Sequence, residues 1–288
     1  MGKFIQYCTG ASLYDGAFDS SGWPAAGMGY IIVAESGRLI VVDGGFGSDA
    51  EALLALMEEQ SGGKKPEAAL WIITHPHMDH YGAIQAIGRN PALADRLRIG
   101  KIVYRFPMEF TDKAGNPGML EQPERDLAEI CAATGAEAHC PERDELLDVD
   151  GMIVRFLYVP DDCSILNTAG GNANCCSLIF TVQGKEKTAL ITGDAYARSM
   201  QITAWRYAGQ LKCDIMQMPH HALCDAYCQD FLRFADPKTL LMPISRAGYR
   251  AMHSDMYAYS TGGAVNLAAE AKAEQVYKAF EGTVTLPL

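Results

Sequence analysis

Thr74-His75-Pro76-His77-Met78-Asp79-His80 is the stretch that carries the most information in this sequence. It holds three of the chain's seven histidines, and it follows the short apolar run Ala69–Thr74, which predicts a strand. In a chain of this composition the pattern His-x-His-x-Asp-His occurs by chance only about 3 times in 10,000. We therefore interpret the stretch as a functional site, in preference to a polar loop whose histidines only form hydrogen bonds.

The spacing of these side chains predicts a metal site. In an extended backbone, residues two apart point the same way, so His75, His77 and Asp79 are expected to converge on one point. His80, one position further along, then faces a neighbouring point. Imidazole and carboxylate together suit zinc, manganese or iron, and two adjacent points indicate two metal ions.

The composition limits which partners the protein can have. The 288 residues include 24 Lys and Arg against 35 Asp and Glu, a formal charge of −11, and 49% are hydrophobic. This acidity disfavours extended nucleic acid and anionic membranes, but it leaves open a small anionic substrate held by a metal. No apolar stretch reaches the roughly 20 residues of a membrane span, and the first ten residues lack the apolar core of a secretory signal. We expect a cytoplasmic protein that acts on a small molecule, with its nine cysteines reduced and mostly buried.

The apolar runs along the chain predict strands and helices in an irregular alternation. Gly29–Ala34 and Leu39–Asp43 form a predicted hairpin, and Ser48 is expected to cap the helix that follows. Helices are also expected over Asp225–Phe234 and over the alanine-rich stretch Ala264–Phe280. Without a strict strand–helix–strand rhythm, the pattern favours stacked mixed sheets covered by helices, in a single domain over residues 1–288.

The histidine-rich stretch resembles the signature of the metallo-β-lactamase-fold hydrolases, and three later residues fit the pattern of that family. Asp43 ends an early hairpin, Asp194 ends a later strand, and His220 ends the strand after that. The resemblance extends over roughly residues 29–245. It implies an α+β fold, a four-layer αββα sandwich of two mixed sheets. It also implies that Asp43 orients a ligand histidine and that Asp194 bridges two metals.

One departure from the family pattern concerns the third histidine of the first metal. The interval where it belongs contains only His139, which lies too early in the chain and is interpreted as a surface histidine. The expected place instead holds Asn174 and Ser177, in the run Asn172-Ala173-Asn174-Cys175-Cys176-Ser177. Neutral asparagine is a poorer zinc ligand than imidazole, so the first metal site should be the weaker one.

The Asn-x-x-Ser pattern is similar to that of a subgroup containing the hydrolase domain of DNA-uptake (competence) channel proteins. That subgroup continues with His-His-Gly-Ser, whereas this chain has His220-His221-Ala222-Leu223. We expect Asn174, Ser177 and His221 to contact the substrate. The strand-end position favours His220 as the metal ligand, with His221 as its neighbour.

Several other interpretations remain open from the residues alone. Cys175 or Cys176 is an alternative ligand for the first metal, although buried structural thiols are commoner. Cys224 and Cys228, together with the two adjacent histidines, form an alternative structural zinc site. The aromatic-rich segment Arg246–Gly263 is either a wall of the substrate pocket, with Arg246 and Arg250 meeting an anion, or an ordinary loop.

The resemblance implies a metal-dependent hydrolase that uses metal-activated hydroxide on a small phosphodiester or another ester-type substrate, such as a lactone or thioester. Zinc is the expected cofactor, as one or two ions, with manganese or iron as alternatives. Asp79 would orient the hydroxide. Two other classes remain: an oxidoreductase similar to the mononuclear-iron persulfide dioxygenases of the same fold, and a binding protein with a relic site. The implied ligands are His75 and His77 for one metal, Asp79, His80 and His220 for the other, and Asp194 for both.

Overall fold

The computed structural model describes residues 2–16, 27–106, 123–160, 173–223, 226–255 and 259–288, and its strands form two seven-stranded sheets. The first sheet has the order β14-β1-β2-β3-β4-β5-β6, and the second has the order β13-β12-β11-β10-β9-β8-β7. The strands of the first sheet are β1 (Lys3–Gln6), β2 (Gly29–Val33), β3 (Leu39–Asp43), β4 (Glu67–Ile72), β5 (Arg98–Val103), β6 (Glu137–His139) and β14 (Val284–Pro287). Those of the second are β7 (Leu146–Val149), β8 (Met152–Tyr158), β9 (Ile179–Gln183), β10 (Thr188–Ile191), β11 (Ile215–Gln217), β12 (Thr239–Met242) and β13 (Gln275–Lys278).

The two sheets follow the same pairing scheme. Read from β14, the first sheet has three antiparallel pairings followed by three parallel ones. Read from β7, the second sheet repeats that succession. Both sheets are therefore mixed, as expected from the sequence.

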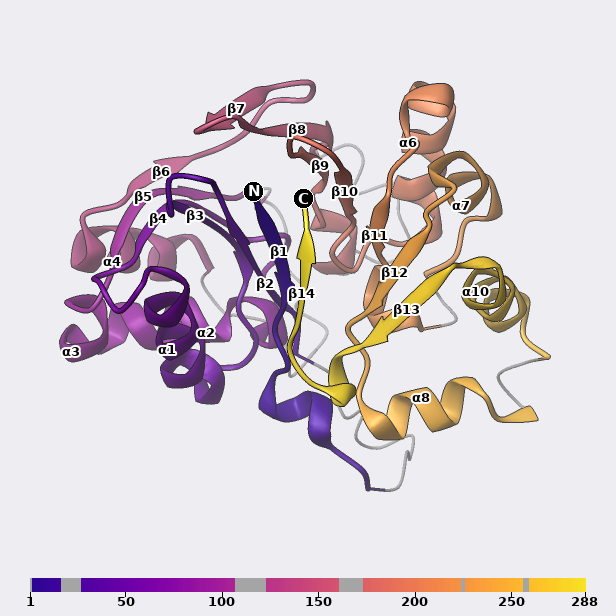
Figure 1. Ribbon diagram of the computed structural model, residues 1–288, viewed down its shortest axis with the longest axis horizontal. Coiled ribbons are helices and arrows are strands. Elements are labelled where there is room, and N and C mark those ends of the chain that lie inside the picture. Colours follow the sequence, from indigo (N-terminus) through magenta and orange to yellow (C-terminus); the bar gives the residue numbers. More distant parts are fainter. Residues whose placement is uncertain (1, 17–26, 107–122, 161–172, 224–225, 256–258) are drawn as a thin grey trace.

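Helices cover the outer face of each sheet, so the molecule has four layers (Figure 1). One group of helices lies against the first sheet, and α6, α7 and α10 lie against the second. The helices are α1 (Ala50–Gln60), α2 (Met78–Arg89), α3 (Pro91–Ala94), α4 (Pro123–Thr134), α6 (Ala197–Tyr207), α7 (Gln229–Ala235), α8 (Arg246–Met252) and α10 (Thr261–Lys272). The αββα sandwich predicted from the sequence is confirmed.

Buried side chains on the two faces of a strand enter different cores. On β2, Ile31 and Val33 pack with the helices of the first sheet, whereas Tyr30 and Ile32 pack between the two sheets. A third core lies between the second sheet and its helices. Because successive side chains of a strand point to opposite faces, a strand covered on both sides is apolar throughout, which explains the unbroken apolar runs in the sequence.

Three predicted boundaries are wrong. Ser48 does not cap a helix, because it lies inside the short 3₁₀ turn η2 (Gly47–Asp49) and α1 begins at Ala50. The stretch Ala264–Phe280 is helical only to Lys272. Its last part forms β13 beside β12, since pairing at a sheet edge outweighs the helix propensity of the alanines. The helix expected to begin at Asp225 begins at Gln229, and Asp225 itself lies outside the described residues.

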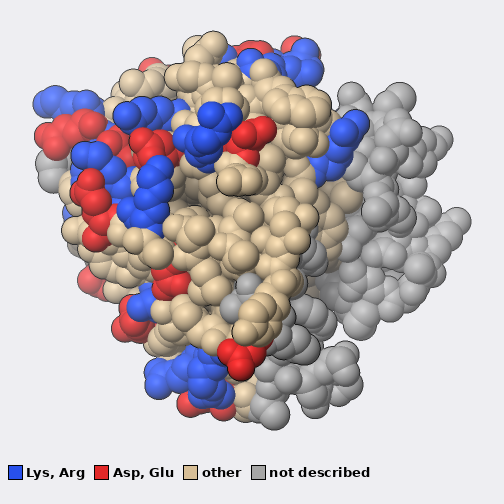
Figure 2. All heavy atoms as spheres, turned by 90° about the vertical axis from the view of Figure 1, so that its right-hand side faces the viewer, with Lys and Arg blue, Asp and Glu red and all other residues tan. Residues whose placement is uncertain are grey.

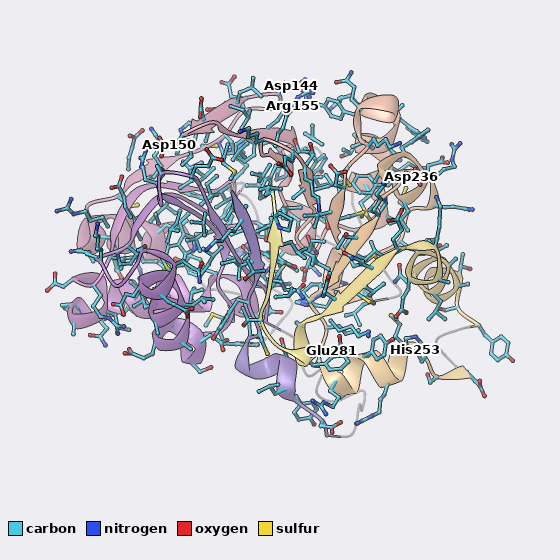
Figure 3. The ribbon with its side chains drawn as sticks, in the orientation of Figure 1. Asp144, Asp150, Arg155, Asp236, His253 and Glu281 are labelled. Atoms are coloured by element: carbon cyan, nitrogen blue, oxygen red, sulfur yellow. The ribbon has the colours of Figure 1, made fainter. Side chains whose placement is uncertain are left out.

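The β7–β8 hairpin is tied to α6 by a small polar cluster. Figure 3 labels Arg155 and Asp144 next to each other at this edge of the molecule. The Arg155 guanidinium lies 2.7 Å from the Asp144 carboxylate and stacks over the Tyr207 ring, whose hydroxyl donates to Asp144. These contacts fasten the antiparallel end of the second sheet to its covering helix.

The surface has mixed charge on the face formed by α6, α7 and α10 (Figure 2). Lys and Arg side chains lie next to Asp and Glu side chains around an uncharged centre. A nucleic-acid footprint would instead gather basic side chains on one face. In the described part of the chain, no helix is long and apolar enough to cross a bilayer.

Candidate metal centre

Histidines and aspartates gather where strands β3, β4, β10 and β11 end. His75 follows β4 by three residues, and His220 follows β11 by three. Asp43 is the last residue of β3, and Asp194 comes shortly after β10. These strands meet in the parallel halves of their sheets, and the carboxyl ends of such strands are the usual place for a binding site.

One cluster of four ligand atoms is made by Asp79, His80, Asp194 and His221. His221 Nε2 lies 3.2 Å from Asp79 Oδ2 and 3.4 Å from Asp194 Oδ2. His80 Nε2 lies 3.7 Å from Asp79 Oδ2 and 3.2 Å from Asp194 Oδ2. Two imidazoles and two carboxylates thus face a common point. We name this group the second cluster, because its ligands come later in the sequence than those of the first cluster, which is described below.

The second cluster fits a tetrahedral metal ion. Zinc binds nitrogen and carboxylate oxygen at about 2.0–2.2 Å, so neighbouring ligands of a tetrahedral ion lie about 3.3–3.6 Å apart. The four separations above lie close to that range. Moreover, His80 Nε2, His221 Nε2 and Asp194 Oδ1 are buried and make no hydrogen bond to any described residue. Buried polar atoms normally have partners, so these atoms mark a place for a bound ion.

His75, His77 and Asp194 make a smaller group, which we name the first cluster. His75 Nε2 lies 3.0 Å from His77 Nδ1 and 3.8 Å from Asp194 Oδ2. The same Asp194 oxygen therefore belongs to both clusters, which is the geometry of a bridging carboxylate. Two metal ions side by side fit these residues.

The start of helix α2 determines which cluster each side chain of the histidine-rich stretch joins. His77 is the residue before α2, so Asp79 and His80 lie in its first turn and not on an extended strand. The expectation that Asp79 shares one point with His75 and His77 through an alternating strand is therefore wrong. Residues 79 and 80 turn together towards Asp194 and His221, away from the point shared by His75 and His77.

Asp43 holds His80 from behind the second cluster. Its Oδ2 accepts hydrogen bonds from His80 Nδ1 and from the Thr74 hydroxyl, each at 2.8 Å. Its Oδ1 accepts from the Thr74 backbone N–H at 2.8 Å. A proton fixed on His80 Nδ1 leaves Nε2 as the ligand atom, which is the orienting role that the resemblance implies.

The two adjacent histidines lie in a strained turn. His220, His221 and Ala222 all have a positive φ, of 44°, 52° and 62°. The left-handed region costs about 1–2 kcal/mol for each residue with a side chain, so the surrounding structure must enforce it. His221 Nδ1 donates to the Pro243 carbonyl at 2.6 Å, which directs its Nε2 into the second cluster.

The charges of the site divide the histidines into two kinds. Burial disfavours the charged imidazole everywhere, and it lowers the pKa of His75 and His77, assisted at His75 by His80. At His80 the carboxylates of Asp194, Asp79 and Asp43 outweigh burial and hold its pKa well above the ordinary value. Asp194 and Asp79 likewise outweigh burial and raise the pKa of His221 to about 10. In the metal-free protein these two imidazoles are protonated at neutral pH.

This protonation predicts an unusual pH dependence for the metal-free protein. The pKa values of His80 and His221 are higher in the folded protein than the ordinary 6.5, so their contribution to stability is complete below pH 6.5 and declines as the pH rises above it, in the case of His221 up to about pH 10. Each imidazolium costs up to about 1.4 kcal/mol per pH unit in that window. We expect the melting temperature of the chelator-treated protein to fall between pH 6.5 and 8.5.

Two observations separate this effect from other titrations. His75 and His77 have a lowered pKa, so their titration changes the stability of the fold only below pH 6.5. Buried cysteines and tyrosines have a raised pKa, so their titration changes stability mainly above about pH 8.5. The metal-loaded protein, in which the ligand imidazoles are neutral, should lose no stability over the same window. A metal-free melting temperature that stays level or rises would contradict the prediction.

Replacing Asp43 with asparagine should weaken metal binding without removing a ligand. Asparagine has one neutral amide oxygen in place of the two carboxylate oxygens of Asp43. It cannot accept all the hydrogen bonds from Thr74 and His80, so the orientation of the His80 ring is lost. Loss of such a supporting contact costs about 10–100-fold in metal affinity. Competition with a chromophoric chelator measures the affinity, and Asp126→Asn, a buried carboxylate that binds Gln85 and Arg89 on the far side of α2, is the matched control. Equal affinities in the two variants would refute the role of Asp43.

The structure corrects the choice between the two adjacent histidines. His221, which the sequence placed at the substrate, lies in the second cluster, where His220 was expected. His220 lies beside Asp194 and Asn174 instead. Sequence position alone could not reveal this, because the residue types do not predict the left-handed turn that directs both side chains. The available signal for the turn was the glycine that the subgroup has at the position of Ala222, since glycine favours a positive φ.

Two expected substrate contacts turn out differently. Ser177 is fully buried, and its hydroxyl accepts from the Asp194 backbone N–H at 3.1 Å, so in this structure it holds the backbone of Asp194 in place. Asn174 is also buried, and its amide donates to Tyr196 and to His220 Nε2, each at 3.1 Å. Sequence analysis missed Thr74, Tyr196 and Pro243 as supporting residues.

The remaining candidates lie away from the clusters or are engaged elsewhere. His139 is paired with Glu145 at 2.8 Å, on β6. Burial raises the pKa of the Cys176 and Cys228 thiols, and among described residues no cysteine joins a metal-ligand group. Cys224 lies outside the described residues. Arg250 binds Asp15, and Arg246 stacks on Phe280, so the structure does not show either arginine facing the clusters.

Comparison with known proteins agrees with this picture. Residues 24–162 match the family model of the metallo-beta-lactamase superfamily. No curated protein matches the sequence. Among solved structures, Zn²⁺-bound PqqB from Methylobacterium extorquens aligns over 100% of both chains, with 12% identity and a TM-score of 0.57. A diphosphatase of the PhnP family aligns over 100% of this chain and 98% of its own, with 14% identity and a TM-score of 0.52. CmlA, a diiron β-hydroxylase from Streptomyces venezuelae, aligns over 99% of this chain and 54% of its own, with 11% identity and a TM-score of 0.53.

Proposed function

We propose that the chain, whose residues 24–162 match the family model of the metallo-β-lactamase superfamily, is a metal-dependent hydrolase of that superfamily acting on a small ester-type substrate, most readily a phosphodiester. The observation that carries the proposal is the sharing of Asp194 Oδ2 between two groups of ligand atoms. A divalent ion bound there supplies Lewis acidity and lowers the pKa of water towards neutrality. A pair of ions suits the displacement of an ester or phosphoester leaving group.

The protein residues hold, orient and expose this centre. His75 and His77 would hold one ion, Asp79, His80 and His221 the other, and Asp194 both. Asp79 is the most exposed member of the second cluster, at 13% of its side chain, whereas His80 is fully buried. Asp79 is therefore the carboxylate placed to orient the attacking water and to accept its proton.

The nature of the substrate follows from chemistry and charge. The subgroup resemblance favours phosphodiesters, and one structural neighbour is a diphosphatase. The net charge of −11 argues for a small phosphodiester over an extended nucleic acid. Lactones and thioesters are the other ester-type substrates to compare.

A substrate panel tests this function. The metal-free protein is loaded with zinc, manganese or iron and assayed with a bis-aryl phosphodiester, an aryl phosphomonoester, a lactone and a thioester. Hydrolysis of the diester that requires a metal, and that is lost in His77→Ala, is the expected result. Metal-dependent turnover of the lactone or thioester alone would reassign the substrate class. No metal-dependent turnover of any member would reject a hydrolase.

One observation supports a second candidate. His75, His77 and Asp194 form a two-histidine, one-carboxylate triad, which is the ligand set of mononuclear non-haem iron oxygenases. A persulfide dioxygenase-like oxidoreductase would use that triad alone. The ligand-complete second cluster favours the hydrolase. Purification with a single iron, together with oxygen consumption on glutathione persulfide, would favour the oxidoreductase.

A further inference from the structure

His220 is left without a role once His221 is placed in the second cluster. Its Nε2 lies 3.9 Å from Asp194 Oδ2, nearly the same as the 3.8 Å from His75 Nε2 to that oxygen. The first cluster is the one that lacks an imidazole in the sequence pattern. A histidine that approaches Asp194 nearly as closely as His75 does therefore stands next to an incomplete ligand set.

The left-handed turn explains how two adjacent side chains reach the same carboxylate. In an extended strand end, neighbouring residues point to opposite sides, so only one of them could face Asp194. With positive φ at both positions, the His220 and His221 rings lie 6.1 Å apart, and both approach Asp194 Oδ2. The strained backbone thus brings a second imidazole to the site.

The two rings take different directions from Asp194. The His221 ring lies 5.4 Å from that of His80, in the second cluster. The His220 ring instead lies edge-on to Tyr196 at 5.4 Å, beside Asn174. Asn174 occupies the loop in which the family pattern places the missing histidine. His220 consequently lies beside both the shared carboxylate and the residue that occupies the family's third-histidine position.

The contact with Asn174 sets the state of that nitrogen. An amide nitrogen can only donate, so in the 3.1 Å contact with Asn174 the Nε2 atom of His220 is the acceptor and presents its lone pair. A ring nitrogen has a single lone pair, so an ion bound at His220 Nε2 would replace the Asn174 amide as its partner. The His220 side chain is mostly buried, at 15% exposure.

We propose that His220 is the third nitrogen ligand of the first cluster, so that the consecutive residues His220 and His221 hold two different metal ions. The proposal rests on the metal-holding part of the proposed function, and it deepens that site by assigning its third imidazole. The Asn174 amide, which contacts the same Nε2 atom, marks the direction in which that nitrogen would meet the ion.

Metal titration of single variants tests the assignment without any substrate. Metal-free wild type, His220→Ala, His221→Ala and the control His139→Ala are titrated with Zn²⁺ against a chelator, and bound ions are counted by mass spectrometry. With Co²⁺, the visible absorption reports the coordination of each ion. We expect two ions in wild type and in His139→Ala. His220→Ala should bind one ion more than about a hundredfold more weakly and keep the other unchanged.

A second pair of variants separates ligation from structural damage. His221→Ala should weaken the ion that His220→Ala keeps. Adding Asn174→His to His220→Ala should restore the lost ion, because it returns an imidazole to the expected loop position. Two ions bound with wild-type affinity in His220→Ala, or loss of the same ion in both single variants, would overturn the assignment. Wild type that binds two ions but hydrolyses nothing would reject the proposed function and leave this assignment standing.

Discussion

Replacing Asp194 with asparagine is expected to empty both clusters and to reduce turnover at least a thousandfold. The Oδ2 atom of Asp194 lies 3.8 Å from His75 Nε2, 3.2 Å from His80 Nε2 and 3.4 Å from His221 Nε2. A neutral amide cannot bridge two divalent ions with the same strength, and the ions supply several kcal/mol of transition-state stabilisation. A loss of about 4 kcal/mol is already a thousandfold in rate.

A second readout accompanies the loss of metal in Asp194→Asn. The carboxylate is the first of the charges that raise the pKa of His80 and of His221 against burial. Without it both pKa values should fall, and the metal-free protein should lose much of its destabilisation between pH 6.5 and 8.5. Asp214→Asn, which changes a carboxylate that accepts from Thr188 N–H at the opposite end of the second sheet, is the matched control. Retention of two tightly bound ions by Asp194→Asn would contradict the bridging role.

Replacing Gly82 with alanine should destabilise the fold and disturb the second cluster at once. A Cβ atom at this position would lie 2.6 Å from the Gly47 nitrogen and 2.9 Å from two backbone atoms of Phe46. These atoms cannot rotate away, so either the loop or helix α2 must shift. Overpacking costs 1–3 kcal/mol and sometimes more, and a backbone clash places this variant at about 3 kcal/mol.

The effect of Gly82→Ala reaches the metal centre because α2 carries Asp79 and His80 in its first turn. Urea denaturation measures the loss of stability, and zinc titration measures the accompanying loss of affinity. Gly209→Ala is the control, since a Cβ atom there meets nothing within 4 Å. Equal denaturation midpoints for the two variants would show that the loop yields without cost.

The sequence was most informative where one residue type has few alternative roles. The histidine-rich stretch is predicted from its own spacing, Asp43 and Asp194 are predicted from the family resemblance, and the structure brings all of them together. The four-layer fold follows from the family resemblance and is confirmed. Patterns of apolar residues also located most strands, because strands buried on both faces leave unbroken runs.

The sequence failed where tertiary contacts or backbone strain decide the outcome. The positions of the His220 and His221 side chains depend on three consecutive residues with a positive φ. An alanine such as Ala222 gives no sign in the sequence that its backbone is left-handed. The strand β13 was hidden in an alanine-rich stretch, because pairing with β12 overrides local propensity. The early start of α2 turned Asp79 and His80 away from the alternation that a strand would have given.

The shared pairing scheme of the two sheets has a consequence for the site. Counted along each sheet, β3 corresponds to β10 and β4 to β11. Asp43 and Asp194 thus stand at equivalent strand ends, and His75 and His220 each follow the equivalent strand by three residues. Each half of the fold therefore contributes one aspartate and one histidine from its two central neighbouring strands, so the metal centre depends on both halves and neither half alone carries the full set of side chains.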